Sequence, residues 1–356
     1  MESTHQTKTL QGQALKEAAA RLSAEEPRLY PRDIAARLGV SEGELAASKT
    51  GENTVRLEGT WQNFVKRLPQ LNKVMSLTRN EGCVLEHKGT FQKVQTFGEG
   101  HHAMGQILGP IETRIFFHAW HVAFYISQPE KKGFKETIQV FDKSGEAVTK
   151  IYLDEKNGNR KAWDQLIADF KSKDQSNTFI TESYQKADTL SKEEIDAKAF
   201  RNDWKSMKDT HEFFSLLRRH QVHRIDALHL AGKEFAYRVK PEDLQLLLEN
   251  AAETAFPIMI FAGNRGNVQI HQGKINRVVP MNHWLNIMDP NFNMHLRMDL
   301  VNDAWVVRKQ TKDGIVTSLE LFSKERELIA QFFGLRKFGK PEKEDWRKLI
   351  YSLEKV

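Results

Sequence analysis

The chain has 356 residues, 40% hydrophobic and 28% charged, which is long enough for two ordinary globular domains. No run approaches the roughly 20 apolar residues that a spanning helix needs, so composition excludes stable membrane insertion. The formal net charge is +6. Basic and acidic residues are interspersed along the sequence, and we expect most of them to lie on the solvated surface.

The N-terminal segment 1–11 is polar and lacks the apolar core of a secretory signal, which predicts a cytoplasmic protein. Helices are expected over 14–38, where apolar residues recur every three or four positions. Short apolar runs broken by Gly, Asn and Asp follow Val74, and they predict antiparallel strands such as 113–117. The single cysteine, Cys83, permits no internal disulfide and is expected to be a free buried thiol.

The same order of elements returns in the second half. The polar stretch 171–190 is typical of an exposed linker, and Ser191 with Glu194 forms a capping box for the next helix. Helical periodicity covers 191–230, and strand-like runs such as 316–322 follow Ile258. We therefore predict an N-terminal repeat over 1–190 and a C-terminal repeat over 191–356.

Direct comparison of the halves supports an internal duplication. Residues 75–94 and 259–278 are identical at seven of twenty positions, where average residue usage predicts roughly one or two. The matches include the turn-forming pairs Asn80 with Asn264 and Gly82 with Gly266. The correspondence continues at similar spacing further along the chain through the pairs Pro110 and Pro290, Gly133 and Gly314, Phe141 and Phe322, and Tyr152 and Phe333.

One segment has the pattern of a DNA-binding helix-turn-helix. It covers 31–48, with Gly39 at the turn. Its second helix would begin Ser41-Glu-Gly-Glu44, and carboxylates there would face phosphates. DNA binding is therefore a remote alternative, and no nucleic-acid partner is expected.

The segment 209–220, D-T-H-E-F-F-S-L-L-R-R-H, is the sharpest candidate site. Asp209 and Glu212 are spaced as a capping pair that opens a helix, which puts His211 in the first turn. The helix dipole disfavours an imidazolium there, so His211 would keep a lone pair for a metal. Phe214 and Arg218 add an aromatic and a basic group nearby. The alternative is a surface histidine with Phe213 and Phe214 in the core.

Two further regions combine basic and aromatic side chains. In T-R-I-F-F-H, strand alternation places Arg114, Phe116 and His118 on one face, where a cation beside aromatics could contact a flat anionic ligand. A half-exposed surface arginine is the alternative. Arg224, Lys309 and Arg336 could each neutralise a ligand carboxylate or be ordinary surface charges.

Together these segments resemble the bacterial cytoplasmic haemin transport and degradation family, whose members are often called haemin-degrading factors. The resemblance spans nearly the whole chain and includes the duplicated halves. Its motifs are R-D-I-A-A-R-L-G-V-S-E-x-E-L from Arg32, W-x-x-M-x-D-x-H-x-F-F around His211, I-M-I-F-A-G-N-R-G-x-V-Q-I from Ile258 and T-K-D-G-x-V-T-S-L-E-L-F from Thr311.

The resemblance implies an α+β fold with a tandem structural duplication. Each half would be a large antiparallel β-sheet with flanking helices, and haem would lie in a cleft between the halves. His211 would bind the iron, Arg114 would lie on the other side of the haem, and Phe116 and Phe214 would contact the porphyrin. The remaining implied contacts are basic groups at the propionates, Arg224, Lys309 and Arg336, and the pocket residues Gln331 and Phe333.

Two positions depart from the family pattern. Gln310 stands where proline is expected, and Phe333 stands where tyrosine is often found, which removes a hydroxyl that could bond to haem. The resemblance implies a cytoplasmic protein that takes up imported haem, non-covalently bound, and cleaves the ring reductively with release of iron. His211 and Arg114 would be catalytic, and Arg114 would act through water.

A non-enzymatic haem carrier that delivers haem to a separate oxygenase is the alternative, because axial ligation and propionate contacts serve both functions. An inner-membrane haem importer and an electron donor are the possible partners besides haem. His220, His223 and His229 are the other histidines near enough in sequence to replace His211 as the ligand.

Overall fold

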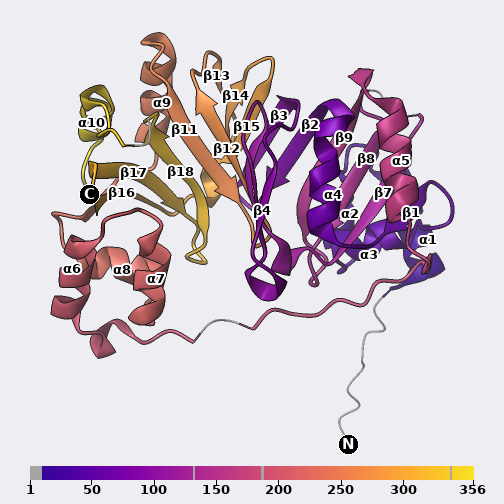
Figure 1. The fold of residues 1–356 in the computed structure, drawn as a ribbon, viewed down its shortest axis with the longest axis horizontal. Helices are drawn as coiled ribbons and strands as arrows, with labels where there is room; N and C mark the ends of the chain where they lie inside the picture. Colours follow the sequence, from indigo (N-terminus) through magenta and orange to yellow (C-terminus); the bar gives the residue numbers. More distant parts are fainter. Residues whose placement is uncertain (1–9, 131–132, 186–187, 337–338) are drawn as a thin grey trace, which may run out of the picture. The chain divides into compact units, whose positions relative to one another are not determined.

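The computed structural model describes residues 10–130, 133–185, 188–336 and 339–356, and Figure 1 shows their helices and strands. The strands form two nine-stranded sheets with flanking helices, which confirms the predicted α+β class. Residues 1–9, which make up most of the polar N-terminal segment, lie outside the described part.

The first half of the sequence contains three helices, one strand, a fourth helix, the remaining strands and a closing helix. In chain order its elements are α1 (Gly12–Glu25), α2 (Pro31–Arg37), α3 (Glu42–Ala47), β1 (Thr54–Leu57), α4 (Trp61–Arg67), η1 (Leu68–Leu71), β2 (Asn72–Arg79), β3 (Cys83–Gly89), β4 (Gln95–Phe97), η2 (Gly100–His102), β5 (Met104–Ile107), β6 (Glu112–Phe116), η3 (Phe117–Ala119), β7 (Val122–Ser127), β8 (Glu136–Phe141), β9 (Ala147–Gly158) and α5 (Arg160–Phe170).

The second half repeats this order of α-helices and strands. Its elements are η4 (Lys192–Glu194), α6 (Ala197–Ser206), α7 (Glu212–Arg219), α8 (Arg224–Ala231), β10 (Ala236–Val239), α9 (Asp243–Glu253), β11 (Ile258–Gly263), β12 (Asn267–Gly273), β13 (Val278–Met281), β14 (Trp284–Met288), β15 (Phe292–Arg297), η5 (Met298–Leu300), β16 (Asp303–Thr311), β17 (Gly314–Phe322), β18 (Leu328–Gly334) and α10 (Glu344–Tyr351).

The strand orders show the duplication directly. One sheet runs β1-β7-β8-β9-β2-β3-β15-β14-β13, and the other runs β10-β16-β17-β18-β11-β12-β6-β5-β4. The two orders are identical if each strand is replaced by its repeat counterpart. Register agrees as well, because Met75 is paired with Tyr152 and the matching Met259 with Phe333. The repeat correspondence read from the sequence is therefore confirmed.

The described residues divide into two compact units. The first contains the chain up to Thr78, His87–Tyr184 and Asn264–Val268, and the second contains Arg79–Glu86, Gln185–Gly263 and Gln269–Val356. The main boundary therefore falls at Tyr184, a few residues before the predicted position near Leu190. Each unit also includes one short segment from the other half of the sequence, which a simple cut into 1–190 and 191–356 does not capture.

The matching asparagines explain these short segments. In the second unit, Asn80 accepts hydrogen bonds from the backbone of Gly82 and Cys83 and donates to the carbonyls of Gly263 and Ile329. In the first unit, Asn264 accepts from Gly266 and Asn267 and donates to the carbonyls of Ala147 and Val148. Each amide closes a hairpin turn and fixes it to its own unit.

The matching glycines are required by close packing at the same turns. A Cβ atom on Gly82 would lie 2.8 Å from Ile329 Cγ2, and one on Gly266 would lie 2.6 Å from Val148 Cγ1. Both distances are shorter than ordinary Cβ contacts, so any larger residue would force Ile329 or Val148 to move. Cys83 follows in the first turn as a free, buried thiol, as predicted, and burial raises its pKa to about 12.

Apolar faces of the sheets and helices form the cores. In the first unit, Phe64 on α4 and Trp163 on α5 pack with sheet residues such as Val140 and Ile151. In the second unit, Trp346 on α10 and Leu247 on α9 join strand residues such as Ile260 and Phe332. A separate cluster holds α6, α7 and α8 against the sheet through Phe200, Trp204, Phe213, Leu216, Leu228, Trp305, Val307 and Phe322.

Helices α2 and α3 form the predicted helix-turn-helix pattern, but α3 is not accessible. Every residue of α3 is buried, and Glu42 forms an ion pair with Lys150 on β9. The backbone of Gly43 also donates to the carbonyl of Gly145. Because the helix that would read DNA is packed inside the first unit, the segment has a structural role here.

The segment 171–190, predicted to be an exposed linker, is partly packed against the first unit. The side-chain amide of Gln175 accepts from the Arg56 backbone N–H and donates to the Arg56 carbonyl, as a neighbouring strand would, and Phe179 is buried. The capping box of Ser191 and Glu194 does form, but on the short turn η4. Asp196 caps α6 instead, because its carboxylate accepts from two backbone N–H groups at the start of that helix.

Candidate functional site

His211 lies immediately before α7, at its N-cap, and not within the first turn as predicted. Phe213 and Leu216 face the core from this helix and hold it in place, and the side chain of His211 is 92% exposed. The predicted capping pair is not formed, because Asp209 bonds to His211 and the carboxylate of Glu212 accepts from the backbone of Lys208 instead. An accessible imidazole therefore stands at the beginning of α7.

Asp209 fixes the orientation of this imidazole. One carboxylate oxygen accepts from the backbone N–H of His211 at 2.9 Å and lies 2.6 Å from Nδ1 of the ring. The bond from the backbone holds the pKa of Asp209 below its usual value, and the bond from the ring and the charge of Arg336 act in the same direction. An ionised carboxylate can only accept, so Nδ1 carries a proton, and in the neutral ring Nε2 has the lone pair and faces solvent.

The other histidines of this region are held by the protein. Nε2 of His220 lies 2.8 Å from the carboxylate of Asp203, and its side chain is only 17% exposed. Nδ1 of His223 accepts from the backbone of Ile225. His229 packs edge-to-face on Trp305, with ring centroids 4.7 Å apart. Of these four, His211 has the geometry of an accessible ligand.

The two phenylalanines after His211 have different environments. Phe213 is buried, and the Lys309 ammonium and the Arg224 guanidinium lie 4.4 Å and 5.0 Å from its ring centroid. Phe214 is 65% exposed, so the expectation that both belong to the core is wrong for Phe214. A large exposed aromatic three residues after His211 offers an apolar contact beside the imidazole.

Three of the predicted site residues converge on one carboxylate that sequence reasoning missed. Glu320 on β17 has a completely buried side chain. It accepts two hydrogen bonds from Arg224, at 2.9 and 2.8 Å. It also accepts one from Lys309 at 3.0 Å and one from Gln331 at 2.9 Å. These four residues form the Glu320 network.

The positive charges of Arg224 and Lys309 keep the Glu320 carboxylate ionised. Burial alone would raise the pKa of Glu320, but attraction to Arg224 and Lys309 outweighs it and lowers that pKa to about 2. Lys309 is also buried, with a side chain 5% exposed, and burial lowers its pKa while Glu320 opposes the shift. Two cations face one carboxylate, so the network carries one surplus positive charge for an anionic ligand.

A partly exposed aromatic face adjoins the network. On β18, Gln331 and Phe333 alternate with the buried Phe332, and on β11 Phe261 is paired with Gln331. Phe261 and Phe333 contact edge-to-face, with centroids 5.2 Å apart. Phe261 and Phe333 therefore present flat, partly exposed apolar groups on this face of the sheet.

Arg114 and Phe116 lie in the first unit, on the partly exposed face of β6. Their neighbours Ile115 and Phe117 are buried, which confirms the predicted alternation as far as Phe116. The strand ends there, so His118 belongs to the turn η3 and not to the strand face. The guanidinium of Arg114 donates to Glu112 at 3.1 Å, and the Arg114 side chain is 32% exposed. This arginine is neither buried nor unpaired.

The second unit thus contains seven of the predicted site residues, His211, Phe214, Arg224, Lys309, Gln331, Phe333 and Arg336, and the first unit contains Arg114 and Phe116. Sequence reasoning missed Glu320 and the role of Asp209. A single carboxylate within the apolar run S-L-E-L-F was the available signal for Glu320, since an unpaired charge rarely occupies a buried strand.

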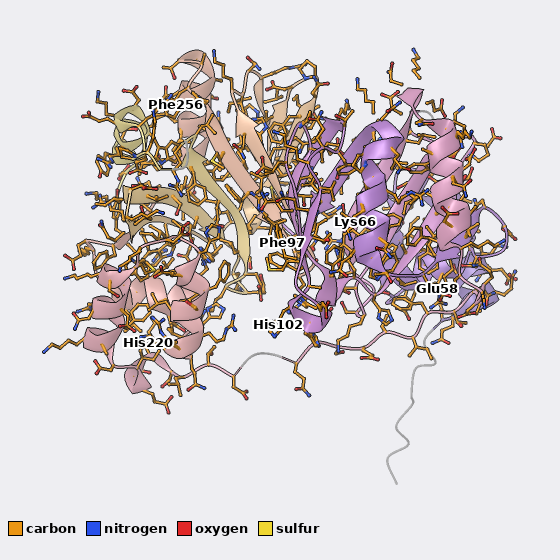
Figure 2. The ribbon with its side chains drawn as sticks, in the orientation of Figure 1. Glu58, Lys66, Phe97, His102, His220 and Phe256 are labelled. Atoms are coloured by element: carbon orange, nitrogen blue, oxygen red, sulfur yellow. The ribbon has the colours of Figure 1, made fainter. Side chains whose placement is uncertain are left out.

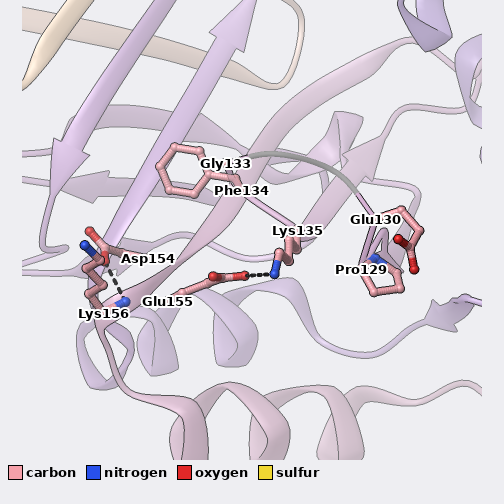
Figure 3. A pocket seen from close by; sticks show the side chains of 8 residues that line it. All are labelled: Pro129, Glu130, Gly133, Phe134, Lys135, Asp154, Glu155 and Lys156. Atoms are coloured by element: carbon pink, nitrogen blue, oxygen red, sulfur yellow. Dashed lines mark hydrogen bonds and ion pairs between the residues drawn. The ribbon is translucent and has the colours of Figure 1, made fainter.

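A pocket of about 590 Å³ lies elsewhere in the first unit and contains none of these residues. Its lining is mostly charged or polar, and an ion pair joins Lys135 to Glu155 at 3.7 Å, as Figure 3 shows. The lining residues are Pro129, Glu130, Gly133, Phe134, Lys135, Asp154, Glu155 and Lys156. Five of these eight residues are charged and Phe134 is the one aromatic group among them, so the lining differs from the aromatic and basic surroundings of His211.

Within the described ranges, no three His, Cys, Asp or Glu residues are grouped as ligands of a bare metal ion. A single nitrogen ligand beside aromatic and basic groups is instead typical of a metal that arrives inside an organic ring. The part of the chain described here also contains no helix long and apolar enough to cross a bilayer.

Comparison with known proteins identifies similar chains along almost the whole length. The family model of the haemin-degrading HemS/ChuX domain matches twice, at residues 39–170 and 221–353, in agreement with the duplication. The hemin transport protein HmuS of Yersinia pestis is 36% identical over 332 residues, which is 93% of this chain and 94% of that protein.

Two solved structures are also similar. Holo-PhuS, described as a heme-binding protein from Pseudomonas aeruginosa, has 42% identity and a TM-score of 0.92, covering 96% of this chain and 99% of that one. ChuS, described as an E. coli heme oxygenase, has 35% identity and a TM-score of 0.83, covering 95% of this chain and 99% of that one.

Proposed function

Because this chain belongs to the haemin-degrading HemS/ChuX family, we propose that it binds haem non-covalently through His211 and degrades it reductively, with release of iron. The observation that carries the proposal is the His211 imidazole, whose Nδ1 is held by Asp209 and whose Nε2 is open to solvent. A neutral imidazole in this arrangement is a good ligand for haem iron.

The surroundings of His211 suit the rest of the haem molecule. Phe214 and Phe333 provide apolar contacts for the porphyrin in the second unit, and Phe116 provides one in the first. The surplus positive charge of the Glu320 network and the charge of Arg336 would attract the two propionates. Gln331 connects the aromatic face to that network.

Phe333 takes part through its ring alone, because it lacks the hydroxyl that a tyrosine would place there. Gln310, at the other position that departs from the family pattern, is exposed and donates to the carbonyl of its neighbour Thr311 at 3.3 Å. We assign it no contact with haem.

In the degradation reaction haem is the substrate, and its ring supplies most of the chemistry. Ring opening consumes dioxygen and electrons, and a separate electron donor must provide the electrons, since the single cysteine, Cys83, is buried. His211 would hold the iron and orient the ring. Arg114 would stabilise negative charge that develops on the reacting oxygen, because its guanidinium is partly exposed and can donate through water.

The two functions are each favoured by a different relative. ChuS is called a heme oxygenase, which favours degradation, whereas HmuS is called a hemin transport protein, which favours carriage. We place degradation first and retain the haem carrier as the second function. In either case the protein would work in the cytoplasm and receive haem from an inner-membrane importer.

Two measurements test this proposal. Haemin titration should show a weaker complex with a shifted Soret band for His211→Ala and an unchanged complex for the matched control His220→Ala. An unchanged His211→Ala spectrum would remove the assigned ligand. Haem-loaded protein should then lose its Soret band when a reductant is added in air with catalase present. Persistence of the band, or protection by catalase, would leave only the carrier function.

A further inference from the structure

The second unit contains a sheet face that repeats the Arg114 face of the first unit. In the first unit, cross-strand rows join Phe97, Met104 and Phe116, and beside them Gln95, Gln106 and Arg114. In the second unit, the corresponding rows over β13, β14 and β15 join Met281, Trp284 and Arg297, and beside them Val279, Asn286 and His295. By register, His295 is the counterpart of Arg114.

Both faces expose large apolar side chains, which is unusual for surface positions. Phe97 and Met104 are 50% and 41% exposed on the first face, and Figure 2 labels Phe97. Met281 and Met288 are 59% and 39% exposed on the second. On β14 and β15 the opposite side is packed, since Leu285, Ile287, Met294 and Leu296 belong to the core. The exposed groups are therefore not needed to close that core.

Hydrogen bonds fix the tautomer of His295. The amide nitrogen of Asn286 donates to the carbonyl of Val279 at 3.0 Å, which leaves Asn286 Oδ1 as an acceptor. Nδ1 of His295 lies 2.8 Å from that oxygen, so Nδ1 carries the proton. Nε2 then has the lone pair. Asp209 fixes the Nδ1 proton of His211 in the same way. In both residues a hydrogen-bond acceptor at Nδ1 leaves Nε2 as the nitrogen that can bind a metal.

We propose that this face, formed by β13, β14 and β15, is a second haem-binding site in which Nε2 of His295 coordinates the iron. The inference rests on the proposed function, because it treats the Arg114 face as one that contacts haem. It goes beyond that function by assigning a second haem per chain. The indole of Trp284 and the thioethers of Met281 and Met288 are the apolar contacts for the porphyrin.

Charges on the face fit this ligand. The guanidinium of Arg297 lies 5.4 Å from the centroid of the Trp284 ring and is held by Asp299 at 2.7 and 2.6 Å. It lies on the row beside His295 and can contact a propionate at the edge of the porphyrin. Glu86, which accepts from Asn293 at 3.3 Å, places a negative charge near His295, where it would face the positive charge of the ferric iron–porphyrin core.

The test is the haem stoichiometry of the intact chain, measured with haemin by absorbance and by calorimetry. Wild-type protein should saturate at two equivalents. His211→Ala and His295→Gln should each saturate at about one, and the double variant should lose both histidine-ligated spectra. We expect His295→Gln to weaken haem binding at the second site by at least about tenfold. Removing only the hydrogen-bond partner of a metal ligand already lowers metal affinity by about this much, and this variant removes the ligand itself.

Controls separate the possible failures. Gln can still donate to Asn286, so His295→Gln should keep the wild-type circular dichroism and melting temperature. His283→Ala removes a nearby histidine in the β13–β14 turn and should change neither site. Metal-free protoporphyrin should bind the His295 face equally in wild type and His295→Gln, because only iron needs the imidazole.

Saturation of the wild type at one equivalent, with His295→Gln unchanged, would overturn the second site and leave the His211 proposal intact. Loss of the second equivalent in His283→Ala instead of His295→Gln would also overturn it. If His211→Ala binds normally while His295→Gln loses one equivalent, the proposed function fails at its assigned ligand and the second site stands.

Discussion

The two units each pair an arginine with a glutamate, but in different environments. In the second unit, Arg224 and Lys309 bond to Glu320, whose side chain is completely buried. In the first, Arg114 bonds to Glu112 on its own strand while its side chain stays 32% exposed. A buried charge must keep its partners, whereas a partly exposed one can exchange its partner for water or a ligand. The Glu320 network is therefore held rigidly, whereas Arg114 can change its partner.

Removing the buried carboxylate should have the largest effect. Glu320→Gln leaves Lys309 and Arg224 without their counter-ion, and breaking such a pair costs about 3–5 kcal/mol in the free energy of unfolding. Glu112→Gln is the matched change at the Arg114 pair and should cost less, because Arg114 is partly exposed and can bond to water once its partner loses its charge. Urea denaturation of both variants measures the difference, and equal losses would contradict the contrast between the two units.

Acid should remove the same contribution from the wild type. The pKa of Glu320 falls from 4.5 to about 2 on folding, so its stabilising contribution is complete above pH 4.5 and is lost as the pH falls toward 2. At about 1.4 kcal/mol per pH unit, this amounts to about 3 kcal/mol. The stability gap between wild type and Glu320→Gln should therefore narrow below pH 4.5. A gap that stays constant down to the lowest pH at which both proteins fold would show that Glu320 does not titrate this way.

Asp209→Asn should have an intermediate effect on the proposed ligand. An amide can still contact Nδ1 of His211 but no longer enforces the tautomer that leaves Nε2 free. Loss of such a partner typically lowers metal affinity by about 10–100-fold. Asp203→Asn, which alters the partner of His220, is the control and should leave haemin affinity unchanged. Haemin titration distinguishes the two, and an equal loss in both variants would argue against a specific role for Asp209.

The smallest effect on stability is expected at Arg114. Arg114→Ala should lower the free energy of unfolding by less than Glu320→Gln does, because Arg114 is partly exposed whereas the residues of the Glu320 pairs are buried. The rate of Soret loss in the reductant assay should nevertheless fall, since the variant lacks the proposed hydrogen-bond donor. Arg160→Ala, which breaks another exposed pair of the first unit, should leave that rate unchanged. A normal rate in Arg114→Ala would restrict the role of this residue to binding.

The sequence alone determined the duplication and most of its local chemistry. Asn80, Gly82 and their counterparts are residue types typical of turns and recur at the same spacing, so the turns could be recognised without coordinates, although the contacts that require the glycines could not. Amphipathic periodicity likewise identified the helical segments before each sheet. The motif around His211 gave a candidate ligand because imidazole, aromatic and basic groups lie close together in the chain.

Only the tertiary structure decided which charges are paired. Arg224, Lys309, Glu320 and Gln331 are separated by up to 107 residues in sequence and meet because sheet register and the packing of α8 bring them together. The tautomers of His211 and His295 were also beyond sequence reasoning, since each depends on one hydrogen-bond partner at Nδ1. Residue types fix what chemistry is available, but long-range packing fixes which atoms remain free to perform it.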